Sequence, residues 1–344
     1  MTLKAMITGL AGPQLTDWER GFLRDVRPCG VILFARNVET QEQIKRLVGD
    51  ARAAIGDAQV PVYIDQEGGR VQRIRPPLGR WLPPARAYGQ IFGEGAPARA
   101  AVRLVSRLMA HDLKALGITA NCVPVLDVPV PGAHDIIGNR AYGTSVAPIV
   151  ALGGAAAEGH LAGGVLPVIK HVPGHGRALA DSHLALPEVD ASRVELEASD
   201  FAPFKALAHL PVGMTAHVVY RAIDRDAPAS TSALVIRDVI RGHMGFDGLL
   251  MCDDLSMKAL TGTMRARTRA VMAAGCDVAL HCNGDAAEMA DVAAEAPALS
   301  GVALRRYERA LKSIAKVEPF DQDLAVALLA AMRSALEGNA AAIS

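Results

Sequence analysis

The segment D-G-L-L-M-C-D-D-L-S-M, from Asp247 to Met257, joins a short apolar run to two adjacent acids. An apolar run without polar alternation is typical of a parallel strand that is buried on both faces. A stretch with helical spacing follows at residues 264–274, and a second apolar run follows at 277–281. Strand, helix and strand in this order predict a β-α-β unit, the building block of α/β proteins with a parallel sheet.

The same alternation extends along most of the chain. We predict strands near residues 5–10, 30–34, 60–65, 118–128, 164–170, 212–217, 248–253 and 277–281, and helices over 40–55, 97–116, 232–243, 264–274, 285–294 and 304–317. Thr40 and Asp285 are expected N-caps, and Pro97 is expected in a first helical turn. Eight strands alternating with helices predict an α/β fold with a single (β/α)8 TIM-type barrel. A doubly wound open sheet is the alternative, but no G-x-G-x-x-G follows the first strand.

No linker or low-complexity block divides the 344 residues. This length accommodates one barrel of roughly 250 residues with insertions. We therefore expect residues 1–318 to form the barrel as one catalytic domain. Residues 319–344 are expected to form a helical extension that packs on the barrel or frays from it.

Composition excludes several classes of partner. Basic and acidic residues both number 36, so no long-range field favours nucleic acid or an anionic membrane. The late apolar run at 324–332 is too short to cross a bilayer. Five scattered cysteines form no C-x-x-C pair and no disulfide framework, which indicates a reducing compartment. Because no convincing signal peptide is present, we expect a cytoplasmic monomer that acts on a small molecule.

Active sites of such barrels lie at the carboxyl ends of the strands. The third predicted strand ends in I-D-Q-E-G-G-R-V-Q-R, residues 64–73. Asp65 and Glu67 alternate, so both could point the same way if the strand continued, and Gly68 and Gly69 allow a sharp turn. The acids and the following arginines could form a salt-bridged turn that caps the barrel. They could equally bind vicinal sugar hydroxyls through bidentate hydrogen bonds.

The fifth strand leads into I-K-H-V-P-G-H-G-R-A-L-A-D-S-H-L-A-L-P, residues 169–187. So many titratable groups at one strand end indicate a functional site. His171, His175 and His183 could bind a metal, although the Pro-Gly pair at 173–174 interrupts the helical spacing of H-x-x-x-H metal motifs. Alternatively, Asp181 could orient His183 for proton transfer. A structured loop in which these histidines only form hydrogen bonds is the third possibility.

Two adjacent acids, Asp253 and Asp254, end the seventh predicted strand. Acids after a buried strand are costly unless they serve a site or are neutralised. Strand alternation sends the two to opposite faces, so at most one should point into the barrel mouth, and periodicity leaves open which one. The other would be structural, for example as a cap of the following helix. Arg140, in the loop at 134–143 after the fourth strand, indicates only a solvated charge when taken alone.

Together these four segments resemble the bacterial β-N-acetylglucosaminidases of glycoside hydrolase family 3. The chain matches the family's D-Q-E-G-G-R-V-Q-R block, its I-G-x-R loop, its K-H-x-P-G-H-G…D-S-H…L-P block and its S-D-D-L-S-M block, in the same order. The similarity extends through most of the chain, and the third block is highly specific. Cys252 replaces the usual Ser, Val172 the usual Phe, and Asn139 the common acid before Arg140. None of these departures removes a catalytic group.

The resemblance implies a retaining glycosidase in which Asp253 is the nucleophile, His183 the general acid/base and Asp181 the partner of that histidine. It implies that N-acetylglucosamine is held in the first subsite by Asp65, Arg73, Arg140, Lys170 and His171. It also implies a cytosolic enzyme of peptidoglycan recycling. The substrate would be N-acetylglucosamine β-1,4-linked to anhydro-N-acetylmuramic acid, with or without a peptide. No metal and no organic cofactor is expected.

Two other functions stay open at this point. A metal-dependent barrel hydrolase would use His171, His175 and His183, and chelators would abolish its activity. A non-catalytic sugar-binding barrel would retain affinity without turnover. The intact pair of Asp253 and His183 argues against the second alternative.

Overall fold

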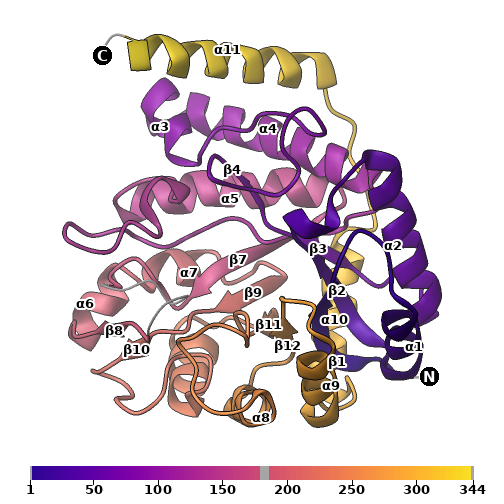
Figure 1. The fold of residues 1–344 in the computed structure, drawn as a ribbon. Helices are drawn as coiled ribbons and strands as arrows, with labels where there is room; N and C mark the ends of the chain where they lie inside the picture. The colour runs from indigo at the N-terminus through magenta and orange to yellow at the C-terminus, as the bar shows by residue number, and fades with distance from the viewer. Residues whose placement is uncertain (1, 179–185, 342–344) are drawn as a thin grey trace.

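In the computed structural model, residues 2–178 and 186–341 are described, and eight parallel strands within them form one sheet. The strands are β1 Lys4–Gly9, β2 Pro28–Leu33, β3 Val62–Ile64, β6 Ala120–Asn121, β7 Leu166–Val172, β9 Val212–Thr215, β11 Leu249–Met251 and β12 Ala279–His281. Their order is β11-β9-β7-β6-β3-β2-β1-β12. A parallel bridge between Met251 and Val278 joins the two ends of this sheet. The predicted (β/α)8 barrel is therefore confirmed (Figure 1).

Helices surround this sheet. They are α1 Asp17–Val26, α2 Gln41–Ile55, α3 Arg86–Phe92, α4 Ala96–Ala115, α5 Val146–Ala162, α6 Arg193–Ala198, α7 Ala202–Ala206, α8 Met264–Ala274, α9 Ala286–Glu295, α10 Gly301–Ser313 and α11 Gln322–Ala341. The predicted caps are present: the side chain of Thr40 accepts from Gln43 N, and that of Asp285 accepts from Glu288 N. Such caps satisfy N–H groups that the first helical turn leaves unpaired.

Of the helices given above, α1, α3, α5, α6 and α7 were not predicted, and the two longest of them, α1 and α5, show why. Helix α1 has a capping box between Thr16 and Glu19, a local motif that could have revealed it. Helix α5 has small or apolar residues on nearly every side, because α4 covers one side and the barrel strand β7 the other. A helix buried all round lacks the polar stripe that amphipathic patterns detect. The helix predicted at 232–243 is present, but residues Val235–His243 adopt π-helical hydrogen bonding.

Strand ends near the barrel mouth differ from the predicted ones. The strand predicted at 118–128 is reduced to β6, and β3 ends before Asp65. A short hairpin of β4 Gln66–Gly68 and β5 Val71–Gln72 follows. Its turn uses Gly68 and Gly69, with φ of 105° and 56°, and a Cβ at Gly68 would lie 2.3 Å from the carbonyl oxygen of Pro83. The predicted sharp turn is confirmed, and it brings Arg73 back beside Asp65.

Outside the barrel, the chain adds two smaller features. A parallel pair of two-residue strands joins β8 Glu188–Val189 to β10 Val219–Tyr220. After α10, helix α11 lies along α4 and α3 at the upper edge of Figure 1, and its residues Ala325, Leu329 and Met332 are buried there. In the described parts of the chain, no helix is long and apolar enough to cross a membrane. All five cysteines are free and buried.

Candidate active site

A pocket of about 270 Å³ opens at the carboxyl ends of the barrel strands. This is where barrel enzymes place their catalytic residues. Six residues singled out from the sequence line the pocket: Asp65, Arg73, Arg140, Lys170, His171 and Asp253. Glu67 lines the pocket as well; the sequence offered it beside Asp65 as a possible sugar-binding acid, but the family resemblance did not place it in the first subsite. The structure thus brings residues from four distant segments into one cavity.

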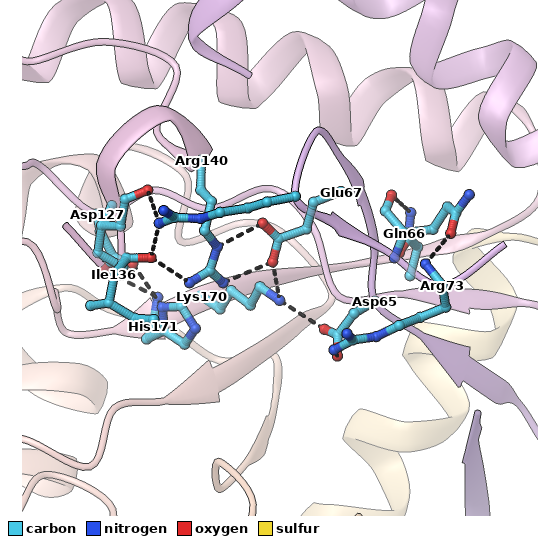
Figure 2. Close-up of polar contacts among 12 residues, drawn as sticks. Asp65, Gln66, Glu67, Arg73, Asp127, Ile136, Arg140, Lys170 and His171 are labelled. Atoms are coloured by element: carbon cyan, nitrogen blue, oxygen red, sulfur yellow. Dashed lines mark hydrogen bonds and ion pairs between the residues drawn. The ribbon is translucent and has the colours of Figure 1, made fainter. Parts of the chain in front are cut away.

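The ammonium group of Lys170 organises one wall of this pocket (Figure 2). Its Nζ lies 2.8 Å from Asp65 Oδ1 and 2.7 Å from Glu67 Oε1. Arg73 Nη2 lies 3.0 Å from Asp65 Oδ2. Arg140 donates to Glu67 through Nε and Nη2, both at 2.8 Å. Asp65 and Glu67 therefore do point the same way. The residues that form the salt-bridged turn are the same residues that line the pocket.

Every member of this cluster is charged at neutral pH. Burial opposes ionisation of Glu67, but Arg140 and Lys170 outweigh it and hold the pKa of Glu67 at about 2. In the same way, Lys170 and Arg73 overcome burial and hold the pKa of Asp65 well below its ordinary value. The two carboxylates raise the pKa of Lys170 against the effect of its burial. The wall is a fixed set of donors and acceptors.

Arg140 needs no acid at the preceding position. Asn139 is exposed, whereas the guanidinium of Arg140 is held by the bidentate pair with Glu67 and by a bond of 3.1 Å to the carbonyl oxygen of Ile136. A bidentate arginine–carboxylate pair fixes direction as well as charge. The replacement at residue 139 therefore leaves Arg140 fully supported.

Behind His171 lies an acid that sequence reasoning missed, Asp127. It is completely buried, and its Oδ2 lies 2.7 Å from His171 Nδ1. Its Oδ1 accepts from the backbone N–H of His171 and of His175, at 3.2 and 2.7 Å. A neutral His171 that donates from Nδ1 to Asp127 keeps Nε2 as an acceptor. In the sequence, Asp127 is the acid that ends the apolar run V-P-V-L-D at 123–127, and this position could have marked it as a site residue.

His175 also lines the pocket, and it is kept neutral. Burial, and next the nearby imidazole of His171, lower the pKa of His175 to about 4. The two rings meet edge to face with centroids 5.6 Å apart. Within residues 2–178 and 186–341, no group of three or more His, Cys, Asp or Glu side chains could hold a metal ion.

Both Asp253 and Asp254 border the pocket. Strand alternation does not extend to them, because β11 ends at Met251. The two acids differ in their bonds. Asp254 Oδ1 accepts from Ser256 N and Cys282 N, and its Oδ2 accepts from the Ser256 hydroxyl. Asp254 ties two loops together and caps no helix, since Thr263 is the N-cap of α8.

The remaining predicted residues, Asp181 and His183, lie outside the described residues. The segment before them is firmly held. Arg177 Nε lies 2.7 Å from Asp200 Oδ2, and the Tyr220 hydroxyl donates to the carbonyl oxygen of Gly174. With the bond from His175 N to Asp127, these contacts fix the direction in which the chain leaves β7.

Comparison with known proteins agrees with this geometry. Residues 4–317 match the model of the glycosyl hydrolase family 3 N-terminal domain. The chain is 40% identical over 287 residues to the beta-hexosaminidase of Alkalilimnicola ehrlichii, covering 82% of each chain. It resembles the crystal structure of NagZ from Neisseria gonorrhoeae with a TM-score of 0.85 and 31% identity, covering 96% of this chain and 98% of that one. That protein has also been solved with N-trifluoroacetyl-D-glucosamine and with a zinc ion.

Proposed function

Since the chain belongs to glycosyl hydrolase family 3 and is a glycoside hydrolase of the beta-hexosaminidase type, we propose that it releases terminal, non-reducing β-linked N-acetylglucosamine. The observation that carries this proposal is the pocket itself. A rigid wall of Asp65, Glu67 and Lys170 faces a cavity that Asp253 also borders. Fixed donors and acceptors beside an anionic carboxylate suit a hydroxylated ring with its anomeric carbon near a nucleophile.

Charge supports an uncharged sugar in this subsite. Four carboxylates, those of Asp65, Glu67, Asp253 and Asp254, line the pocket against the cations of Arg73, Arg140 and Lys170. An anionic ring would lie beside the ionised carboxylates of Asp65 and Glu67. Asp65, Arg73, Arg140, Lys170 and His171 are the proposed sugar-binding residues. The volume of about 270 Å³ is near the lower limit of ligand pockets, roughly 300 Å³, which favours one terminal ring over a polymer segment.

The proposed reaction proceeds with retention. Asp253 attacks the anomeric carbon while His183, protonated, gives its proton to the departing oxygen. His183 then takes a proton from water, which cleaves the glycosyl–Asp253 bond and restores the carboxylate. Asp181 keeps the imidazole basic enough to alternate between these states. Most retaining glycosidases use a second carboxylate for this proton transfer, and here an imidazole takes that place.

The proposed natural substrate is N-acetylglucosamine β-1,4-linked to anhydro-N-acetylmuramic acid, with or without a peptide. This substrate is a fragment of peptidoglycan, so the proposed role is recycling of cell-wall material in the cytoplasm. We also propose that the protein acts as a monomer and needs no cofactor.

Turnover of a nitrophenyl β-N-acetylglucosaminide, with and without a chelator, tests the proposal. We expect hydrolysis that the chelator leaves unchanged, and little release of sugar from the interior of chitin or intact wall polymer. Loss of activity on chelation, restored by zinc, would favour the metal-dependent alternative with His171, His175 and His183. Binding of N-acetylglucosamine without any turnover would favour the non-catalytic alternative.

Asp127→Asn should raise KM for this substrate about tenfold or more and leave kcat less affected. The new amide can donate to His171 Nδ1, which would shift the proton of that ring to Nε2 and turn an acceptor in the pocket into a donor. A buried donor or acceptor that loses its hydrogen-bond partner costs about 1–3 kcal/mol. Steady-state kinetics at several pH values measure the change. An unaltered KM in a folded variant would show that the tautomer of His171 does not matter for sugar binding.

A further inference from the structure

Three buried polar residues lie directly behind the sugar-binding wall and outside the active-site pocket: Gln66, Asn121 and His160. They come from β4, β6 and α5 and are 4%, 0% and 1% exposed. Buried polar groups of this kind cost free energy unless they are hydrogen-bonded. None of the three is needed for the reaction described above, so their mutual bonds call for another explanation.

The side chain of Asn121 continues the barrel sheet beyond its last backbone pair. Strand β3 pairs with β6 up to Ile64, which lies in register with Asn121. Beyond that point, Asn121 Oδ1 accepts from Gln66 N at 2.9 Å, and Asn121 Nδ2 donates to Gln66 O at 3.0 Å. One carboxamide thus gives the backbone of residue 66 both bonds that a neighbouring strand would supply.

His160 supports the orientation that the two bonds to Gln66 require of this carboxamide. Burial lowers the pKa of His160 to about 4, so its ring is neutral at physiological pH. Its Nδ1 lies 2.9 Å from the carbonyl oxygen of Ala156, which can only accept, so Nδ1 carries the proton. Its Nε2 is then an acceptor, and Asn121 Nδ2 lies 3.1 Å from it. The amide nitrogen therefore faces an acceptor on both sides, Gln66 O and His160 Nε2, while Oδ1 accepts from Gln66 N.

Holding Gln66 in place holds its neighbours. Asp65 and Glu67 flank it, and both reach Lys170. The Gln66 side chain bonds to the returning strand of the hairpin, with Oε1 accepting from Arg73 N and from Ile74 N, both at 3.0 Å (Figure 2). Residue 66 therefore supports three groups: its backbone carries the neighbouring Asp65 and Glu67, and its side chain holds the backbone of Arg73.

We propose that Asn121 is a positioning residue for sugar binding, and that His160 helps to hold its amide in place. Asn121 does not touch the sugar. It fixes Asp65, Glu67 and Arg73 at the spacing that the hydroxyl groups of the ring require. This inference rests on the proposed function for the identity of the sugar. Asp253 lies in the segment after β11, and its position does not depend on Asn121. Substitution of Asn121 should therefore weaken sugar binding more than it slows the chemical step.

Asn121→Asp is the sharpest test, because it keeps the shape and removes one donor group. A neutral carboxyl has one proton, which can reach either Gln66 O or His160 Nε2 but not both, and an ionised carboxyl has none. We expect KM for the nitrophenyl β-N-acetylglucosaminide to rise about tenfold or more, with a smaller change in kcat. KM should also rise with pH as the introduced carboxyl ionises, more steeply than KM of the parent protein.

Substitutions at His160 provide the matched comparison. His160→Gln keeps an acceptor near the position of Nε2 and should leave KM close to that of the parent. His160→Leu removes the acceptor, costs the amide of Asn121 one of its bonds, and should raise KM in the same direction as Asn121→Asp but by less. Val105→Ala in α4 deletes buried volume and removes none of the hydrogen bonds of the three residues, so it should lower the melting temperature with KM unchanged.

The outcomes are distinct. An unchanged KM in folded Asn121→Asp, or an equal rise of KM in Val105→Ala, would overturn the positioning role. If the parent protein turns over no β-N-acetylglucosaminide, the proposed function fails while the positioning role can still be decided. In that case a crystal structure of Asn121→Asp should show Lys170 Nζ displaced from Asp65 or Glu67. Unchanged distances of 2.8 and 2.7 Å would overturn the role.

Discussion

Asp253→Ala should reduce turnover of a nitrophenyl β-N-acetylglucosaminide by about four orders of magnitude or more, with little change in the affinity for the free sugar. The proposed covalent step has no substitute once the carboxylate is gone, and loss of a nucleophile is among the most damaging changes in enzymes of this kind. The wall of Asp65, Glu67 and Lys170 stays intact in this variant, so the ring should still bind. Steady-state kinetics and calorimetric titration with N-acetylglucosamine measure the two effects.

Asp254→Asn is the matched control. Asp254 borders the same pocket, but its oxygens are bonded to Ser256 and to Cys282 N. The amide retains one acceptor oxygen, so we expect a lower melting temperature and a milder loss of activity. A fluorinated glycosyl inhibitor that traps the intermediate should label Asp253. Peptide analysis identifies the labelled residue, and a label on Asp254 would refute the assignment of Asp253 as the nucleophile.

His183→Ala should damage cleavage of the natural disaccharide far more than the first step on a nitrophenyl glycoside. A sugar alkoxide is a poor leaving group and needs a proton, whereas a nitrophenolate departs without one. General acid–base help of this kind is worth about 10²–10⁴ in rate. The ratio of kcat/KM for the two substrates therefore measures the role directly.

The second step offers an independent test of the same residue. Without His183, water has lost its base, so hydrolysis of the glycosyl–Asp253 bond should limit turnover of the nitrophenyl substrate. Azide needs no deprotonation, and it should accelerate turnover and yield the β-glycosyl azide. Asp181→Ala should show a weaker form of both effects. Equal losses on both substrates, with no rescue by azide, would reduce His183 to a positioning role.

In that event Glu67 would be a poor replacement as the acid. Its pKa of about 2 leaves it ionised at neutral pH, and it is bonded to both Arg140 and Lys170. His171, backed by Asp127, would be the better candidate among the described residues. Its carboxyl group near the end of a barrel strand would otherwise make Glu67 the next candidate. Only its ion pairs show that this carboxyl group has no proton to give.

Local sequence patterns were sufficient to predict the barrel strands and several of the helices. Apolar runs located all eight barrel strands, and the oxygens of Thr40 and Asp285 marked two helix starts. A strand that is buried on both faces appears as a continuous apolar run, and a helix cap appears as one polar residue before the helix. Both patterns are local, so they can be read from the sequence. The parallel order of the strands then placed the chemistry of four distant segments at one end of the barrel.

By itself, then, the sequence determined the barrel, the face that carries the site, and six of the residues that line the pocket. Tertiary structure alone decided which groups meet: Glu67 with Arg140, Asp127 with His171, and Asn121 with the backbone of Gln66. These partners are 73, 44 and 55 residues apart. A buried charge or amide must find a partner because desolvation is costly, but this requirement does not specify the partner. The choice depends on side-chain directions at strand ends, where β11 and β3 stop before their acids and the alternation that governs a strand no longer applies.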